Sequence, residues 1–235
     1  MRKLLIFFLF AILFQPTFAQ STAGQLANDP LLWGSGNLYG KSPSKTGGVN
    51  GATHLDTKWN LADITFFDSK ILEGIPVKYD LKENRLELFA LKEVRMVEVK
   101  KIKSLVWRDS LTHLPKRFIN GNEYNERGAP LTGLLEVLED GKISLLKRNF
   151  VSIRKPDFVA ELGTGNYNTE ISKSAMYYYA IGAVVTEITN RKTLLQAFGS
   201  DASEVKKFMN TNNSSIRSEQ DLVIVFRNYN QKFKK

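Results

Sequence analysis

The sequence has no cysteine and only two histidines, His54 and His113, among its 235 residues. Without cysteine, disulfide bonds, thiol nucleophiles and thiolate metal sites are excluded, and so is lipid attachment to a cysteine after export. Neither histidine has the i, i+4 spacing or the nearby carboxylates of a zinc site, so we predict a surface or capping role for each. We expect no metal ion or other cofactor, and a fold stabilised by packing alone.

The chain also has no long apolar stretch at its start. The apolar run from Leu4 to Phe14 has 11 residues, whereas a helix that spans a bilayer needs about 20. The basic pair Arg2-Lys3 precedes this run, and Thr17-Phe18-Ala19 ends it with a small-x-small pattern. We predict a signal peptide over residues 1–19, rather than an uncleaved anchor, and an exported protein, periplasmic or secreted, that does not span the membrane.

The net charge limits the kinds of partner expected for residues 20–235, the 216 residues that would remain after removal of the signal peptide. Removal of Arg2 and Lys3 lowers the formal charge from +9 to +7. A surplus of this size is usual for a solvated surface, and export argues against nucleic acid as a partner. If the charge has a partner, an anionic glycan, an anionic lipid or an acidic face of an envelope protein fits the compartment.

Residues 20–56 are rich in Gly, Ser, Thr and Asn. Such a composition rarely buries enough apolar area to offset the entropy lost on ordering, so we predict a flexible arm. The apolar cluster Leu31-Leu32-Trp33 is an exception that would dock either on the domain or on a partner. Residues 57–235 are then predicted to form a single β-rich domain.

Two alternating segments, 77–81 and 85–90, form the centre of the predicted sheet. Their apolar residues alternate with polar ones, as in strands with one buried face. A turn at Glu83-Asn84 would pair the segments as an antiparallel hairpin. The predicted partners on the buried face are Leu81 with Leu86, Tyr79 with Leu88, and Val77 with Ala90. Asp80 and Glu87 would then lie opposite each other on the other face.

Further strands are expected on both sides of this hairpin. Residues 64–67 are β-branched and aromatic, and Gly74 and Pro76 indicate an edge or a bulge. Segments 94–99 and 102–107 resemble strands, and the alternation slips between Met96 and Val97, which predicts a bulge or a register change. Three lysines between these two segments form either a charged strand edge or a binding patch: Lys100, Lys101 and Lys103.

The strongest hairpin signal spans residues 134–146 and centres on Asp140-Gly141. This dipeptide favours a two-residue type I′ turn, which would pair Leu138 with Ile143 and Leu135 with Leu146. Both faces of the hairpin are apolar, so we expect it to be covered on both sides. Residues 122–133 are predicted to form a loop, and residues 177–179 and 183–188 the last strands.

After these strands the apolar period changes to that of helices. Leu194, Leu195 and Phe198 indicate a short helix that ends at Gly199. Ser200 is a candidate N-cap for a second helix, and residues 218–221 resemble a capping box for a third. The predicted fold class is therefore α+β, an antiparallel β-rich meander of hairpins followed by two or three C-terminal helices, over about residues 190–231, packed on the sheet.

A resemblance to a known group rests on four ordered features. They are the signal peptide, the strand Val77-Lys78-Tyr79-Asp80-Leu81, the run from Leu135 to Arg148, and a tyrosine-rich strand before helices that end in Phe226-Arg227-Asn228-Tyr229-Asn230. Together they resemble exported β-rich proteins of Bacteroidetes-type bacteria, over about residues 58–231. That group has no known activity, so the resemblance implies only origin and domain extent.

The motifs of common catalytic sites are missing. There is no Gly-x-Ser-x-Gly elbow, and Gly163-Thr164-Gly165 lacks the third glycine of a nucleotide-binding loop. Paired carboxylates remain open, because a glycoside hydrolase needs only two of them about 5–10 Å apart. The candidates on or beside predicted strands are Asp63, Asp80, Glu87, Glu136 and Asp157, and we interpret them as structural. We therefore assign no catalytic, cofactor-binding or metal residue.

Two short motifs allow a binding or modification role. Residues 177–179 are three tyrosines, which either stack on sugars or, because strands alternate, belong mostly to the core. Asp109-Ser110-Leu111 resembles the short O-glycosylation sequon of exported Bacteroidetes proteins, a match that three residues also make by chance.

These observations leave three hypotheses. The first is a non-catalytic exported module of the cell envelope, active in interaction or assembly. The alternatives are a carrier with an apolar pocket between helices and sheet, and a carboxylate-dependent glycan hydrolase. Two converging carboxylates in a cleft would favour the hydrolase, and a closed apolar cavity the carrier.

We predict cleavage after Ala19, because the small-x-small end of the apolar run fits the signal peptidase pattern. Mass spectrometry of the protein from envelope fractions should find Gln20 as the first residue. Intact protein that starts at Met1 in the inner membrane would contradict the prediction.

Overall fold

The computed structural model describes residues 48–110, 112, 114–157, 164 and 168–232. The predicted signal peptide, the cluster Leu31-Leu32-Trp33 and His113 lie outside these residues. The strands are β1 (Val49–Asn50), β2 (Asn60–Phe66), β3 (Ile71–Asp80), β4 (Arg85–Ala90), β5 (Glu93–Glu98), β6 (Ile102–Arg108), β7 (Pro115–Asn120), β8 (Asn125–Glu126), β9 (Ala129–Pro130), β10 (Leu134–Glu139), β11 (Ser144–Arg154), β12 (Thr169–Ile181) and β13 (Val184–Glu187). The helices are η1 (Val99–Lys101), η2 (Gly121–Glu123), α3 (Arg191–Gln196), η3 (Gly199–Asp201), α4 (Ala202–Thr211) and α5 (Glu219–Gln231).

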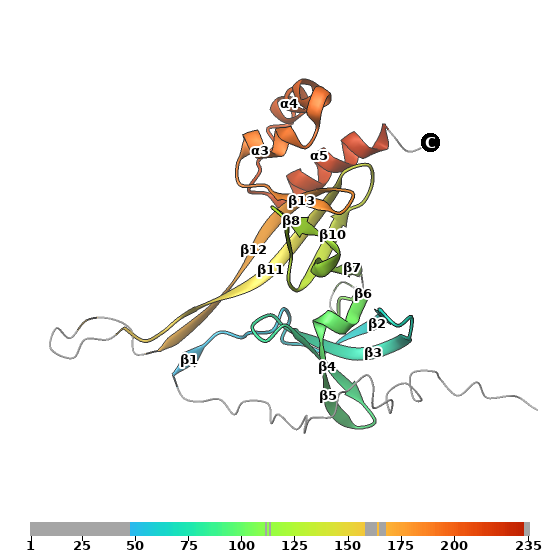
Figure 1. The fold of residues 1–235 in the computed structure, drawn as a ribbon. Coiled ribbons are helices and arrows are strands. Elements are labelled where there is room, and N and C mark those ends of the chain that lie inside the picture. The colour runs from blue at the N-terminus through green and yellow to red at the C-terminus, as the bar shows by residue number, and fades with distance from the viewer. Residues whose placement is uncertain (1–47, 111, 113, 158–163, 165–167, 233–235) are drawn as a thin grey trace, which may run out of the picture.

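The strands form one mostly antiparallel sheet in the order β5-β4-β3-β2-β6-β7-β10-β11-β12-β13-β8-β9, with β1 beside β12. The sheet is strongly curved and forms two curled halves, strands β2 to β7 and strands β10 to β13 (Figure 1). Strands β2 to β7 wrap one core, which also takes in Leu134 of β10, and strands β10 to β13 line two others. Helices α3, α4 and α5 gather at one end of the molecule, on the β10–β12 part of the sheet. The predicted α+β class, hairpins followed by C-terminal helices on the sheet, is confirmed.

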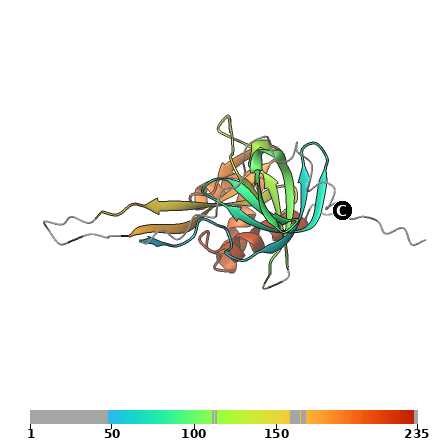
Figure 2. The same ribbon diagram turned by 90° about the horizontal axis from the view of Figure 1, so that it is seen from below.

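A long ribbon projects from the body. Strands β11 and β12 pair from Ser144↔Ala180 to Arg154↔Glu170, whereas β10 accompanies β11 only as far as Arg148. Seen from below, the far part of β11 and β12 extends well beyond both curled halves (Figure 2). β1 joins this part through the parallel pairs Val49↔Thr169 and Asn50↔Glu170. Residues 49–55, which the composition assigned to the flexible arm, therefore contact the domain.

The central hairpin has the predicted faces but a different register. Val77, Tyr79 and Leu88 are buried on one face as expected, yet Val77 pairs with Leu88 and Tyr79 with Leu86, two positions from the predicted partners. The longer turn, residues 81–84, is stabilised because Asp80 Oδ1 accepts hydrogen bonds from the backbone N–H groups of residues 82 and 83. The prediction of opposed carboxylates was wrong, because Asp80 faces Arg85 instead.

Two other local predictions in this half had opposite outcomes. The bulge near Gly74 is confirmed, since the β2–β3 register shifts between Ala62 and Ile64 and Gly74 has a φ of +63°. The prediction of a bulge or a register change between Met96 and Val97 is wrong, because β4 and β5 pair without a shift. The apolar pattern is irregular there because two consecutive residues of a regular strand are apolar. Val97 is buried, and Met96 is on the outer face and only half-buried.

The hairpin of residues 134–146 exists and is covered on both faces, as predicted. Leu145 faces the helices and Leu146 the opposite core. The type I′ turn was wrong: neither Asp140 nor Gly141 has a positive φ, and residues 140–143 form a longer connection with a register shift beside it. Leu146 consequently pairs with Val137 rather than with Leu135.

The C-terminal helices follow the predicted apolar period. Ser218 caps α5, and its side chain accepts a hydrogen bond from the N–H of Asp221. The predicted cap Ser200 is wrong, because it lies inside η3 and Asp201 occupies the cap position of α4 without a side-chain bond. Residues 122–133, predicted as a loop, contain most of η2 and the short pair β8–β9.

The end of α5 is fixed to the β10–β11 connection by Asn230. Its buried side-chain amide accepts a hydrogen bond from Ile143 N (3.2 Å) and donates one to Ile143 O (2.9 Å). Gly141 permits this approach, because a Cβ atom at that position would lie 2.4 Å from Asn230 Cγ. Glycine is therefore needed for space rather than for its backbone angles.

We expect Gly141→Ala to lower the free energy of unfolding by about 2–4 kcal/mol, because it displaces Asn230 and leaves Ile143 without its two buried partners. Asn230→Ala should cost a similar amount. In the Asn230→Ala background Gly141→Ala should cost less than about 0.5 kcal/mol, since the clash is gone. Urea unfolding followed by tryptophan fluorescence measures the cycle, and additive losses would contradict this account.

Candidate functional site

Four of the five candidate carboxylates have local structural partners. The hydrogen bond from Arg108 holds the pKa of Asp63 below its ordinary value, and Gly74 N also donates to Asp63. Glu87 Oε1 lies 3.0 Å from His54 Nε2, so His54 ties the segment before β2 to β4. Asp80 holds the turn of the central hairpin, and Asp157 accepts a hydrogen bond from Arg154 at 2.6 Å.

The fifth carboxylate, Glu136, belongs to a polar cluster under the start of α5. Lys147 Nζ lies 3.9 Å from Glu136 Oε2 and 2.6 Å from Glu219 Oε2. Tyr177 donates a hydrogen bond of 3.0 Å to Glu219. Burial, together with this hydrogen bond, raises the pKa of Tyr177 to about 12. The cluster joins three neighbouring strands to the helix, which is a structural role.

Burial also raises the pKa of Glu136, because desolvation outweighs the attraction of Lys147. A buried acid beside a second carboxylate is the pattern of an acid–base pair. However, neither of the two cavities described below contains Asp or Glu in its lining. Among the described residues, no cluster of three or more His, Asp or Glu side chains could hold a metal ion.

The tyrosine motif and the glycosylation motif are both partly buried. Tyr177 and Tyr179 pack on the helix-side core and Tyr178 on the opposite core, as strand alternation predicts. Ser110 Oγ is inaccessible and makes no hydrogen bond within the described part of the chain. In the folded protein neither motif therefore presents the surface that sugar stacking or O-glycosylation requires.

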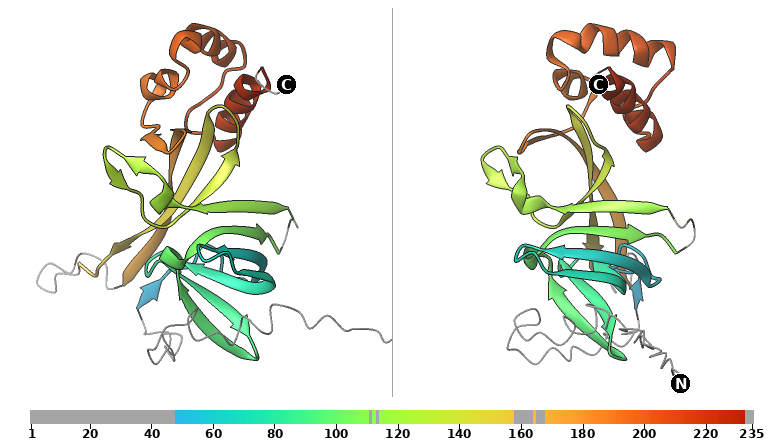
Figure 3. Two further views of the ribbon diagram at one scale, coloured as in Figure 1. Left: turned by 45° about the vertical axis from the view of Figure 1, so that its right-hand side comes forward. Right: turned by 90° about the vertical axis from the view of Figure 1, so that its right-hand side faces the viewer.

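A row of apolar side chains lies on the outer face of the N-terminal half. Leu61 pairs with Pro76, and Phe89 pairs with Val94, while the β3–β4 register places Pro76 beside Phe89. Leu61, Phe89 and Val94 are 49%, 45% and 45% exposed. We call Leu61, Pro76, Phe89 and Val94 the apolar row. The β4–β5 hairpin that carries half of it lies at the end of the molecule opposite the helices (Figure 3).

Two neighbours extend this surface. The Trp59 ring lies 6.0 Å from the Phe89 ring, and Lys78 Nζ lies 4.8 Å above Trp59. Leu91 and Lys92, which connect β4 to β5, have φ angles of +55° and +65°. Two consecutive residues with positive φ in a two-residue connection form a type I′ turn, which matches the twist of the paired strands. Leu91 is 50% exposed at the tip of the hairpin.

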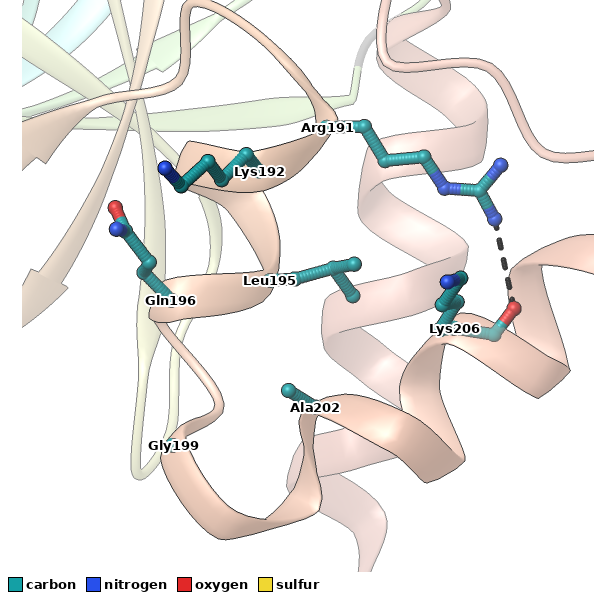
Figure 4. A pocket seen from close by; sticks show the side chains of 7 residues that line it. All are labelled: Arg191, Lys192, Leu195, Gln196, Gly199, Ala202 and Lys206. Atoms are coloured by element: carbon teal, nitrogen blue, oxygen red, sulfur yellow. Dashed lines mark hydrogen bonds between the residues drawn. The ribbon is translucent and has the colours of Figure 1, made fainter.

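The described cavities lie elsewhere. One, of about 220 Å³, lies between the two curled halves, with Tyr79 on one side and Arg148 on the other. Its lining is mostly polar. The other, about 630 Å³, is a groove between α3 and α4 (Figure 4). Its lining residues are Arg191, Lys192, Leu195, Gln196, Gly199, Ala202 and Lys206, and we call it the basic groove.

The sequence did not reveal either surface. The apolar row depends on the relative register of four strands, and the basic groove on how η3 sets α4 against α3. The sequence signals for these surfaces were weak. They were the alternation of Phe89 with Leu88, and the basic pair Arg191 and Lys192 at the start of α3. Within the described residues, every helix falls short of the length and apolarity that a bilayer span requires.

We expect Glu136→Gln to stabilise the protein at pH 7. The folded state binds the Glu136 proton more tightly than the unfolded state does. The protonated carboxyl therefore contributes fully to the free energy of unfolding below its pKa in the unfolded chain, and this contribution is lost as the pH rises through its raised pKa in the folded protein. Gln cannot ionise, so the variant does not lose this contribution at pH 7. Its advantage in the free energy of unfolding over the unmodified protein should become smaller as the pH falls toward 4. Urea unfolding at both pH values measures the difference.

Glu219→Gln is the matched control, because the same change there removes a favourable charge beside Lys147. It should destabilise the protein at pH 7 by up to about 1 kcal/mol. Destabilisation by Glu136→Gln at pH 7 would contradict the role of burial at this position.

Comparison with known proteins finds no matching family model, no matching curated protein and no matching solved structure. The resemblance to exported Bacteroidetes-type proteins stays a prediction from the sequence.

Proposed function

We propose that the chain is an exported, non-catalytic module of the bacterial cell envelope that acts by binding another protein through the apolar row. The observation that carries this proposal is the exposure of Leu61, Phe89 and Val94 in one cross-strand line. Contiguous exposed apolar side chains on a soluble domain mark interaction sites. Aromatic residues such as Trp59 and Phe89 are enriched in the centres of such sites.

The apolar row supplies part of the free energy of binding, because its three exposed side chains together offer less than the roughly 4 kcal/mol of a millimolar complex, and the rest of the interface must add to it. Full burial of a Leu, Phe or Val side chain contributes about 1.5–3 kcal/mol, so three half-exposed side chains offer about 1 kcal/mol each. The left-handed turn at Leu91 and Lys92 holds the end of the hairpin in a defined conformation, which reduces the entropy lost on binding.

The two alternatives receive less support. A glycan hydrolase needs two carboxylates in one cleft, and the candidate acids are bound in separate structural contacts. A carrier needs an apolar cavity under the helices, but that space holds packed side chains such as Phe198, Phe226 and Met209.

The absence of cysteine allows a direct test, since Lys92→Cys provides a unique thiol for a photoactivated crosslinker beside the apolar row. We expect a crosslinked adduct with another protein in the cell envelope. Phe89→Ser with Val94→Ser, introduced into the Lys92→Cys protein, should lower the adduct yield roughly tenfold or more, because about 2 kcal/mol of apolar burial is lost.

The matched control is Ile181→Ser with Val184→Ser, which removes another exposed cross-strand apolar pair, 52% and 61% exposed, from β12 and β13. This control should keep the adduct. Loss of the adduct in both double variants, or no adduct at all from Lys92→Cys, would refute the proposal.

A further inference from the structure

The basic groove has a positive rim that the surrounding chain does not neutralise. Arg191 donates hydrogen bonds to Asn210 Oδ1 (2.5 Å) and to the Lys206 carbonyl oxygen (3.5 Å). Both acceptors are neutral, so they fix the guanidinium in place without cancelling its charge. Figure 4 shows Arg191 reaching across the groove from α3 to α4.

The two lysines of the rim, Lys192 and Lys206, also keep their positive charge unpaired by a carboxylate of the described residues. Lys192 and Lys206 are exposed, and the described residues place no carboxylate within ion-pair distance of either one. The acids of the same helical region are engaged elsewhere. Asp201 accepts a hydrogen bond from Tyr229 at 3.1 Å, and Glu204 pairs with Lys232.

The floor of the groove is apolar. Leu195 of α3 and Ala202 of α4 face each other across it and are only partly buried (Figure 4). A small aqueous anion would interact with the rim and leave this floor in contact with water. An amphiphilic anion would satisfy both, because its charge meets the cations and its carbon chain covers Leu195 and Ala202.

We propose that the basic groove binds the phosphate headgroup of an anionic lipid at a membrane surface. Arg191 is held ready to donate to the phosphate oxygens, and Lys206 of α4 lies on the same side of the groove. The Lys192 side chain points away from both and adds positive charge at the α3 side of the rim (Figure 4). The first carbons of the acyl chains then lie over Leu195 and Ala202. The groove is at the helical end of the molecule, away from the apolar row, so this inference does not depend on the proposed protein partner (Figures 1 and 3).

Sedimentation of the protein from residue 20 onward with lipid vesicles tests the inference. Vesicles of phosphatidylglycerol and phosphatidylcholine should bind the protein, and vesicles of phosphatidylcholine alone should not. A basic residue near an anionic surface contributes about fivefold in affinity. Lys192→Gln with Lys206→Gln should therefore weaken binding about 10- to 30-fold, and added salt should weaken it as well.

The matched control is Lys92→Gln with Lys103→Gln, which changes the net charge equally at exposed positions outside the groove. It should bind nearly as well as the unmodified protein. Equal losses in both double variants would refute the groove and indicate non-specific attraction. Absence of binding to phosphatidylglycerol vesicles would refute it directly.

A second variant separates a lipid from a free anion. Ala202→Gln keeps every charge but places a polar side chain over the apolar floor, so it should weaken vesicle binding several-fold. An excess of inorganic phosphate should not displace the vesicles beyond its effect on ionic strength. If phosphate competes specifically, or if Ala202→Gln binds like the unmodified protein, the ligand is not a lipid and the proposal fails.

Discussion

One antiparallel ladder, between β7 and β10, joins the two curled halves of the sheet, and the arrangement of the molecule depends on it. Leu134 lies at its end and belongs to both halves, since its side chain packs in the N-terminal core while its strand begins the second half. Its backbone N–H donates to Tyr79 Oη, which itself donates to Asn84 Oδ1. Burial raises the pKa of Tyr79, so the hydroxyl keeps the proton that this second bond requires. With no disulfide to reinforce it, this joint relies on hydrogen bonds and packing.

Periodicity predicted which faces are buried, because it depends only on whether positions are odd or even. A shift of two residues preserves that parity, so the faces of the central hairpin were right although its register was wrong. The register was decided by the carboxylate of Asp80, which lengthens the turn by accepting two backbone hydrogen bonds. No alternation pattern contains that information. Gly141 shows the same limit, since the need for glycine was visible but its cause, Asn230, lies 89 positions further along the chain.

The proposed surfaces were invisible for a related reason. Phe89 alternates correctly with buried Leu88, so its exposed side chain looks like an ordinary outward position of a strand. Only the assembled order β2-β3-β4-β5 places it in line with Leu61 and Val94. The basic groove similarly needs η3, which turns the chain between α3 and α4. The sequence suggested that one helix ends at Gly199 and a second begins at Ser200, but it did not indicate the angle between them. Both surfaces arise from tertiary arrangement rather than from a motif.

The distribution of charge separates the two ends of the molecule. In the N-terminal half acids and bases pair closely, as Asp63 with Arg108 and Glu98 with Lys100, so the apolar row lies on an electrostatically balanced face. At the helical end the acids are bound by Tyr229 and Lys232, and the rim of the basic groove keeps its positive charge. A balanced apolar face suits a protein partner, since burial of unpaired charge is costly. An unbalanced cationic groove suits an anionic surface that stays hydrated. The positions of the two surfaces at opposite ends would let one copy of the chain hold a protein and a membrane at the same time.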